Sequence, residues 1–197
     1  MVGINTETDF PGAAEEHFGD SGDKKLPAGG FGREGEYLAW LEADLKAAAA
    51  ERDRPGGRPW IIAGGHRPHP ASAAPLFAKY GVDIYFAGHS HSYARSAPSS
   101  GLPGAVVETH HALNHYAAPN ATTWIVVGGA GCDEMKQGAV TAEEELEESA
   151  AMLPKGSAVV KSSRYATGVL TANFTSLSWR LIDSVTGDTL DTLLITK

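Results

Sequence analysis

Short runs of consecutive apolar residues, each containing or followed by glycine, dominate the pattern of hydrophobic and polar positions along the chain. Three such runs fall at residues 60–65, 83–88 and 123–131. A short segment that is apolar throughout is typical of a strand covered on both faces, so these runs predict buried strands. Residues 74–81 predict a short helix that ends at Gly81. The order strand, helix, strand predicts parallel neighbouring strands in an α/β protein.

Two further helices are predicted. Residues 36–52 form the first, which the sequence Asp-Arg-Pro-Gly-Gly-Arg-Pro ends. Its apolar residues recur at helical spacing and predict one buried face, formed by Tyr37, Leu38, Trp40, Leu41, Leu45 and Ala48. Residues 141–152 predict an acidic helix, in which Thr141 and Glu144 have the spacing of a capping box.

The remaining strand signals lie at the two ends of the sequence. Residues 2–4 predict a short strand. Residues 165–196 predict an antiparallel hairpin around a Thr-Gly-Asp turn, because apolar and polar side chains alternate there. Residues 8–33 are rich in Gly, Asp and Pro, which predicts a loop.

Composition narrows the class of protein. The chain has 197 residues with 42% hydrophobic and 20% charged side chains, which is typical of one globular domain. A net charge of −8 argues against a nucleic-acid partner or an anionic membrane surface. No apolar run reaches the ~20 residues of a membrane span, and the first ten residues do not resemble a signal peptide. The single cysteine, Cys132, allows no internal disulfide, and Asn120 and Asn173 begin sequons that make them candidate glycosylation sites.

Histidines follow two of the predicted strands. His66 ends the first apolar run, and His89 and His91 follow the second, each run ending in a glycine that permits a sharp turn. Residues two apart in an extended segment point the same way, so His89 and His91 are expected to face one side with Cα atoms about 6.6 Å apart. That separation suits two metal ions about 3.5–4 Å apart. One histidine after a strand is usually an ordinary polar residue, but two such strand ends favour a metal site beyond the carboxyl edge of the sheet.

Four segments together resemble the purple acid phosphatases, which are calcineurin-like metallophosphoesterases. They are GGHRP from Gly64, LFAKYGVDIYFAGHSHSYAR from Leu76, VVGGAGCDE from Val126 and LSWRLIDSVTGDTLDT from Leu177. The resemblance implies an αββα sandwich of two sheets flanked by helices, and hydrolysis of phosphate monoesters at acidic pH. It also implies an Fe(III) ion beside a divalent Zn, Mn or Fe ion. By motif, His66 and His89 are implied as ligands of the divalent ion and His91 as a ligand of the ferric ion.

Three blocks of the family pattern are not found: Asp-x-Gly, Gly-Asp-x-x-Tyr and Gly-Asn-His followed by Glu or Asp. They would supply the carboxylate, tyrosine and asparagine ligands and should precede Ile4. We therefore expect residues 1–197 to form a single, N-terminally truncated domain, the C-terminal half of the sandwich. Three neutral imidazoles do not neutralise two cations, so at most weak binding of a divalent ion is expected. His69 is a weaker candidate for a phosphate contact, and the resemblance gives no ligand role to His110, His111 and His115.

Several functions stay open on the sequence alone. The first is an acid phosphatase of which this chain carries the histidine half of the site. The second is a catalytically inactive fragment, or a metal- or phosphate-binding module that pairs with a separate N-terminal half. The third is phosphodiester cleavage, because Gly-His-x-His is shared across the superfamily. Members of the family are commonly secreted, vacuolar or lysosomal, and the two sequons fit such a location.

Overall fold

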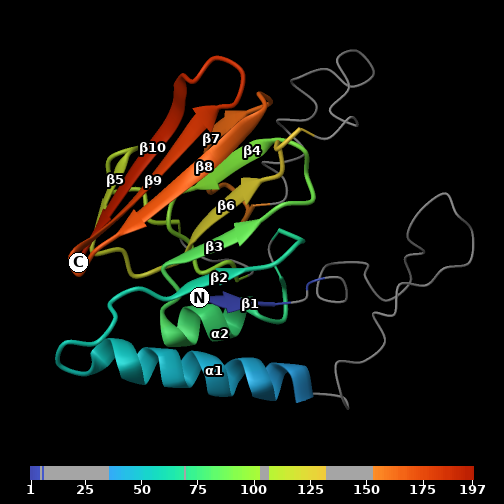
Figure 1. The fold of residues 1–197 in the computed structure, drawn as a ribbon. Coiled ribbons are helices and arrows are strands. Elements are labelled where there is room, and N and C mark those ends of the chain that lie inside the picture. Colours follow the sequence, from blue (N-terminus) through green and yellow to red (C-terminus); the bar gives the residue numbers. More distant parts are fainter. Residues whose placement is uncertain (5, 7–35, 69, 103–106, 132–152) are drawn as a thin grey trace, which may run out of the picture.

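The structure is a computed structural model of the chain, and it describes all residues except 5, 7–35, 69, 103–106 and 132–152. The described residues form two β-sheets and two helices (Figure 1). The helices cover one face of the larger sheet, and the smaller sheet packs on its other face. Cys132, the whole predicted loop at 8–33 and the predicted acidic helix at 141–152 lie outside the described residues.

The larger sheet contains the parallel strands that the apolar runs predict. In spatial order its strands are β1 (Val2–Gly3), β2 (Ile62–Gly64), β3 (Ile84–Ala87), β6 (Thr123–Val127), β4 (Tyr93–Ser96) and β7 (Ala158–Ser162). The first four are parallel, and the helix α2 (Ala74–Tyr80) connects β2 to β3, so the predicted strand–helix–strand unit is confirmed. β4 pairs antiparallel with both β6 and β7, so β7 runs in the same direction as the first four strands; the sequence pattern did not predict β4 and β7.

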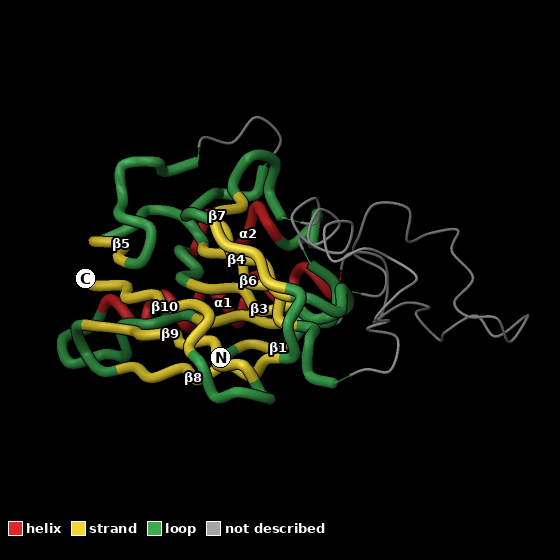
Figure 2. Tube along the Cα trace, turned by 90° about the horizontal axis from the view of Figure 1, so that it is seen from above, coloured by secondary structure: helices red, strands yellow, loops and turns green. Residues whose placement is uncertain are grey.

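The smaller sheet is built mainly from the C-terminal part of the chain. Its strands, in spatial order, are β5 (His115–Ala117), β10 (Thr189–Thr196), β9 (Ser176–Asp183) and β8 (Ala166–Ala172). β9 and β10 form the predicted antiparallel hairpin, and β8 pairs antiparallel with β9. In the view from above in Figure 2, β8, β9 and β10 run side by side in this sheet.

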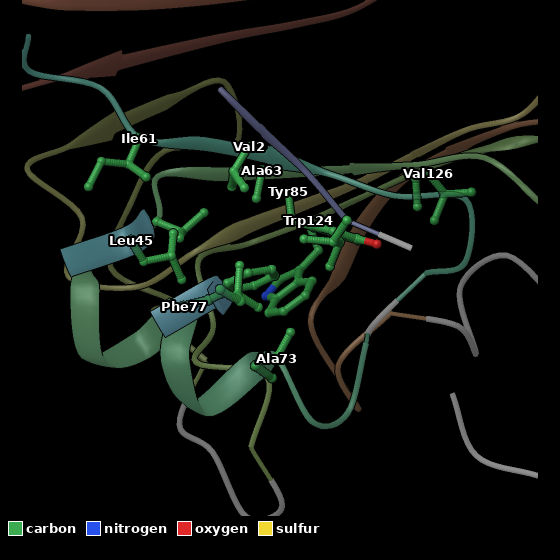
Figure 3. Packing of buried hydrophobic residues seen from close by; sticks show 14 of the residues in the cluster. Val2, Leu45, Ile61, Ala63, Ala73, Phe77, Tyr85, Trp124 and Val126 are labelled. Carbon is green, nitrogen blue, oxygen red and sulfur yellow. The ribbon is translucent and has the colours of Figure 1, made fainter. Parts of the chain in front are cut away.

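Side chains of the central strands alternate between two cores. On β3, Tyr85 lies in the core under the helices, whereas Ile84 lies in the core between the sheets. Trp124 and Ile125 on β6 divide in the same way. Figure 3 shows the helix-side core, where the Phe77 ring centroid of α2 lies 5.4 Å from that of Tyr85 and 5.9 Å from that of Trp124. Both faces of these strands are covered, which explains why their sequence is apolar throughout.

The longer helix, α1 (Glu36–Asp53), buries a narrower face than the sequence predicts. Leu41 and Leu45 are fully buried, but Trp40 is 52% exposed, so its assignment to the buried face is wrong. Successive residues point about 100° apart around a helix, and Leu41 is the neighbour that faces the core. The second helix, α2, ends as predicted at Gly81, which has a φ of 67°. Neither described helix has the length and apolar character that a membrane crossing needs.

A buried polar network joins the two sheets. Arg95 of β4 donates to Asp191 of β10 twice, from Nε to Oδ2 at 2.6 Å and from Nη2 to Oδ1 at 2.9 Å. The Tyr93 hydroxyl donates to the same Oδ2 at 2.5 Å and accepts from Trp179 Nε1 at 3.1 Å, and Arg95 also donates to the Tyr116 hydroxyl. Burial raises the pKa of Tyr93 far above its ordinary 10.0, so this hydroxyl keeps the proton that it donates to Asp191. The network therefore fixes β10 against β4 with matched donors and acceptors.

Candidate metal centre

Two of the three predicted ligands meet at the carboxyl ends of neighbouring strands. His66 follows β2 and His89 follows β3, and their ring centroids lie 5.3 Å apart at an interplanar angle of 73°. The backbone is joined there as well, because the Gly88 N–H donates to the His66 carbonyl at 3.0 Å. The parallel register of β2 and β3 thus brings the two imidazoles to one edge of the sheet. Their role as metal ligands stays a prediction.

The loop after β3 carries His89 and His91, and we call it the histidine loop. It turns at His89 itself and not at Gly88 before it. His89 has a φ of 64°, and the Ser90 N–H donates to the Gly88 carbonyl at 2.8 Å, so residues 88–90 form a tight γ-turn. The expectation of an extended segment from His89 to His91 is therefore wrong, and strand spacing does not set the separation of these two residues. A non-glycine residue in this conformation is strained, and such strain clusters at functional sites.

His91 lies beside the end of β6. A Cβ added at Gly128 would be 1.9 Å from the Ser90 carbonyl oxygen and 3.4 Å from the His91 Cα, so the two backbones are in direct contact. The Gly128 N–H also donates to the Ser92 carbonyl at 3.1 Å. Among the described residues, His66, His89 and His91 do not form a group whose ligand atoms all lie within 4.8 Å of one another. This arrangement does not bring the three histidines within reach of one ion.

The Arg67 side chain contacts a ring nitrogen of His89 that could otherwise bind a metal ion. Its Nη1 lies 2.8 Å from His89 Nε2, and because a guanidinium only donates, that imidazole nitrogen must accept. The backbone of Arg67 is fixed: its N–H donates to the Thr6 hydroxyl at 2.6 Å, and its carbonyl accepts from the Tyr85 hydroxyl at 2.7 Å. Two imidazoles at this spacing fit a divalent ion once the contact between Arg67 and His89 opens.

Removing the charge of Arg67 is expected to strengthen metal binding at this pair. Arg67→Gln should lower the Zn²⁺ dissociation constant at His66 and His89 about tenfold, because a guanidinium repels a divalent ion at short range. Arg67→Lys keeps the charge and should leave the constant near the wild-type value. NMR titration of the ring nitrogens of His66 and His89 measures this site alone. Equal constants for wild type and both variants would show that Arg67 does not compete with the ion.

The structure brings together another group of ligand-type side chains, which the sequence pattern does not single out. Glu108, His110 and His111 have ligand atoms that all lie within 4.8 Å of one another. Within it, His111 Nε2 lies 2.7 Å from Glu108 Oε2. The sequence signal is the spacing Glu-x-His-His, which is weak in a loop because such residues are common on surfaces.

The remaining predicted site residues are not part of these groups. His69, the candidate for a phosphate contact, lies outside the described residues. Both sequon asparagines are exposed. Asn173 Oδ1 accepts from the backbone N–H groups of Thr175 and Ser176 at 2.9 and 2.8 Å, and so orders the turn between β8 and β9.

Known proteins match the chain in its histidine motifs and in its C-terminal sheet. Residues 13–93 match the family described as calcineurin-like phosphoesterase, and residues 121–192 match that described as iron/zinc purple acid phosphatase-like protein C. Acid phosphatase A of Cryphonectria parasitica is 32% identical over 98% of this chain and 36% of its own length. Acid phosphatase type 7 of Mus musculus is 34% identical over 51% of this chain and 27% of its own length. The structure of a purple acid phosphatase from yellow lupin seeds has a similar fold, with a TM-score of 0.59 and 21% identity over 82% of this chain and 28% of the lupin chain.

The chain belongs to the calcineurin-like phosphoesterases, and its C-terminal part is of the purple acid phosphatase type. The resemblance that its motifs carry is thereby confirmed. The two packed sheets agree with the fold that this resemblance implies. The chain spans about a third of the length of these curated relatives.

Proposed function

We propose that this chain supplies the histidine ligands of a dinuclear metal centre that hydrolyses phosphate monoesters. The observation that carries the proposal is the pairing of His66 and His89 at adjacent strand ends, with ring centroids 5.3 Å apart. In this proposal His66 and His89 hold a divalent Zn, Mn or Fe ion, and His91 holds an Fe(III) ion. The relatives named acid phosphatase support the reaction class.

The residues of the chain have distinct parts in this reaction. The imidazoles position the ions at the sheet edge, and a bound pair of ions supplies an activated water and positive charge for the phosphoryl oxygens. Arg67 adds a cation at the same edge, and a guanidinium binds phosphate through paired N–H donors. His69 remains a candidate for a further phosphate contact.

Charge balance limits what the three histidines do by themselves. Neutral imidazoles add no negative charge, and two neighbouring cations need carboxylates to bridge and neutralise them. We propose that carboxylates complete this centre and that residues other than His66, His89 and His91 supply them. We expect the histidines without them to bind one divalent ion weakly.

Two measurements test the proposal. The first is hydrolysis of p-nitrophenyl phosphate at acidic pH by the 197-residue chain with iron and zinc added. The second is NMR of the histidine rings. We expect Zn²⁺ to shift the ring signals of His66 and His89, and His91→Ala to abolish any turnover. Metal-dependent shifts without turnover support the alternative of a metal- or phosphate-binding module that pairs with a separate N-terminal half. Turnover that persists in His91→Ala, or no shift at either ring, contradicts the proposed site. Faster hydrolysis of bis(p-nitrophenyl) phosphate would instead assign a phosphodiesterase.

The location of the protein is a further part of the proposal. Family members are commonly secreted, vacuolar or lysosomal, and an acidic compartment suits an acid phosphatase. The exposed sequons at Asn120 and Asn173 are compatible with glycans added on that route. Mass spectrometry of the protein from its native source, before and after removal of N-glycans, checks both sites.

A further inference from the structure

We infer that Glu108, His110 and His111 form a second metal site, separate from the strand-end histidines and suited to a Zn²⁺-type ion. Their ligand atoms all lie within 4.8 Å of one another. Two imidazole nitrogens and a carboxylate oxygen are a common ligand set for zinc, with a fourth position left for water. Ligands of one tetrahedral zinc ion at about 2.1 Å are about 3.4 Å apart, so side-chain shifts of roughly 1 Å close the site.

The carboxylate of Glu108 is held in place by the surrounding backbone. Its Oε1 accepts from the Asn120 N–H at 3.0 Å, and its Oε2 pairs with His111 Nε2 at 2.7 Å. The Glu108 N–H donates to the Pro98 carbonyl at 2.9 Å, which ties this residue to the end of β4. A ligand fixed in this way loses little conformational freedom when an ion binds.

The imidazole of His111 is buried and that of His110 is exposed, as expected for a metal site that is open to solvent on one side. The His111 side chain is only 4% exposed, and its ring centroid lies 5.4 Å from that of the buried Tyr116. His110 is exposed, and its ring centroid lies 4.0 Å from that of His111. One ring is therefore fixed by packing, and the other can turn to bring its nitrogen to the ion. The ion would replace the hydrogen bond between Glu108 Oε2 and His111 Nε2.

The second site lies at the opposite end of β6 from the first. Asn120, which holds Glu108, precedes β6 at Thr123, whereas the histidine loop contacts Gly128 after the strand ends. A strand of this length spans about 16 Å, so the two sites cannot share an ion. An ion bound here would clamp residues 107–122 onto the core and would stabilise the folded chain by mass action.

Titration of the full chain with Co²⁺ tests the inference. Co²⁺ substitutes for Zn²⁺, and it absorbs visible light when it is bound by few ligands. We expect an absorption band whose dissociation constant rises roughly tenfold or more in His110→Ala and in Glu108→Gln. His115→Ala is the matched control, because this exposed histidine of β5 pairs with Thr196 and is outside the group. Zn²⁺ should also raise the thermal unfolding midpoint of wild type and of His115→Ala more than that of His110→Ala.

Variants at the strand ends separate this site from the proposed catalytic one. His66→Ala should leave the band and its dissociation constant unchanged, because His66 belongs to the other edge of the sheet. The inference is overturned if wild type shows no bound Co²⁺, or if His66→Ala abolishes the band while His110→Ala leaves it intact. NMR of the ring nitrogens of His110 and His111 during a Zn²⁺ titration gives the same answer without relying on colour or activity.

Discussion

Replacing Asp191 with alanine is expected to lower the free energy of unfolding by about 3–5 kcal/mol. The substitution leaves the Arg95 guanidinium inside the sandwich without its carboxylate partner. The Arg95 and Asp191 side chains are only 0% and 6% exposed, and two hydrogen bonds join them. A buried charge that loses its partner retains its desolvation cost, which is why the loss exceeds that of a surface ion pair. Urea denaturation of wild type and variant measures the difference.

A paired substitution separates the charge effect from lost packing. Arg95→Met combined with Asp191→Leu removes both charges, and a buried ion pair replaced by apolar side chains is often neutral or stabilising. The double variant should therefore recover most of the stability that Asp191→Ala loses. If Asp191→Ala costs less than about 1 kcal/mol, as an exposed pair would, the ion pair is solvated and our description of the sheet interface is wrong.

Gly128→Ala is expected to cost about 3 kcal/mol, near the upper end for an overpacked site. The new Cβ would lie 1.9 Å from the Ser90 carbonyl oxygen, and neither backbone can relieve that contact by changing a rotamer. The histidine loop must therefore move away from β6 and lose the hydrogen bond from the Gly128 N–H to the Ser92 carbonyl. Urea denaturation gives the stability, and NMR of the His89 and His91 rings reports the displacement.

Gly88→Ala provides the comparison within the same loop. Its added Cβ would lie 3.9 Å from the nearest atoms, both of His66, which is ordinary van der Waals contact. This variant should change stability by less than about 1 kcal/mol and leave the His89 ring signals in place. Equal losses for Gly88→Ala and Gly128→Ala would mean that any methyl group near the loop is harmful and that the Ser90 contact has no special weight.

The central sheet could be predicted from the sequence because burial on both faces leaves a direct signal. β2, β3 and β6 are apolar in consecutive positions, and the order of β2, α2 and β3 follows from local patterns. The positions of His66 and His89 at one sheet edge follow from the same parallel register. The hairpin of β9 and β10 could be predicted because one face is buried and the side chains alternate.

Other features depend on contacts that no local pattern encodes. β4 overlaps the histidine motif, so its residues give no separate strand signal. Tyr93 and Arg95 of β4 pair with Asp191, which lies far along the chain. The γ-turn at His89 follows from how the chain must reverse between β3 and β4, and a rule for extended segments misses it. The grouping of Glu108, His110 and His111 cannot be predicted from local sequence, because the position of Glu108 depends on its hydrogen bonds with Asn120 and Pro98.

The network between the sheets also bears on how the chain reaches its fold. Arg95 and Asp191 are 96 residues apart in sequence, so Arg95 is synthesised long before its partner. Contacts of such separation slow folding, because the intervening chain must lose its freedom before they form. The face of the larger sheet that carries Arg95 must therefore stay exposed to water until β10 has been synthesised and packs against it. An intermediate with one sheet formed would expose an arginine among apolar side chains, which makes the arrival of the C-terminal hairpin the step that commits the chain to its native state.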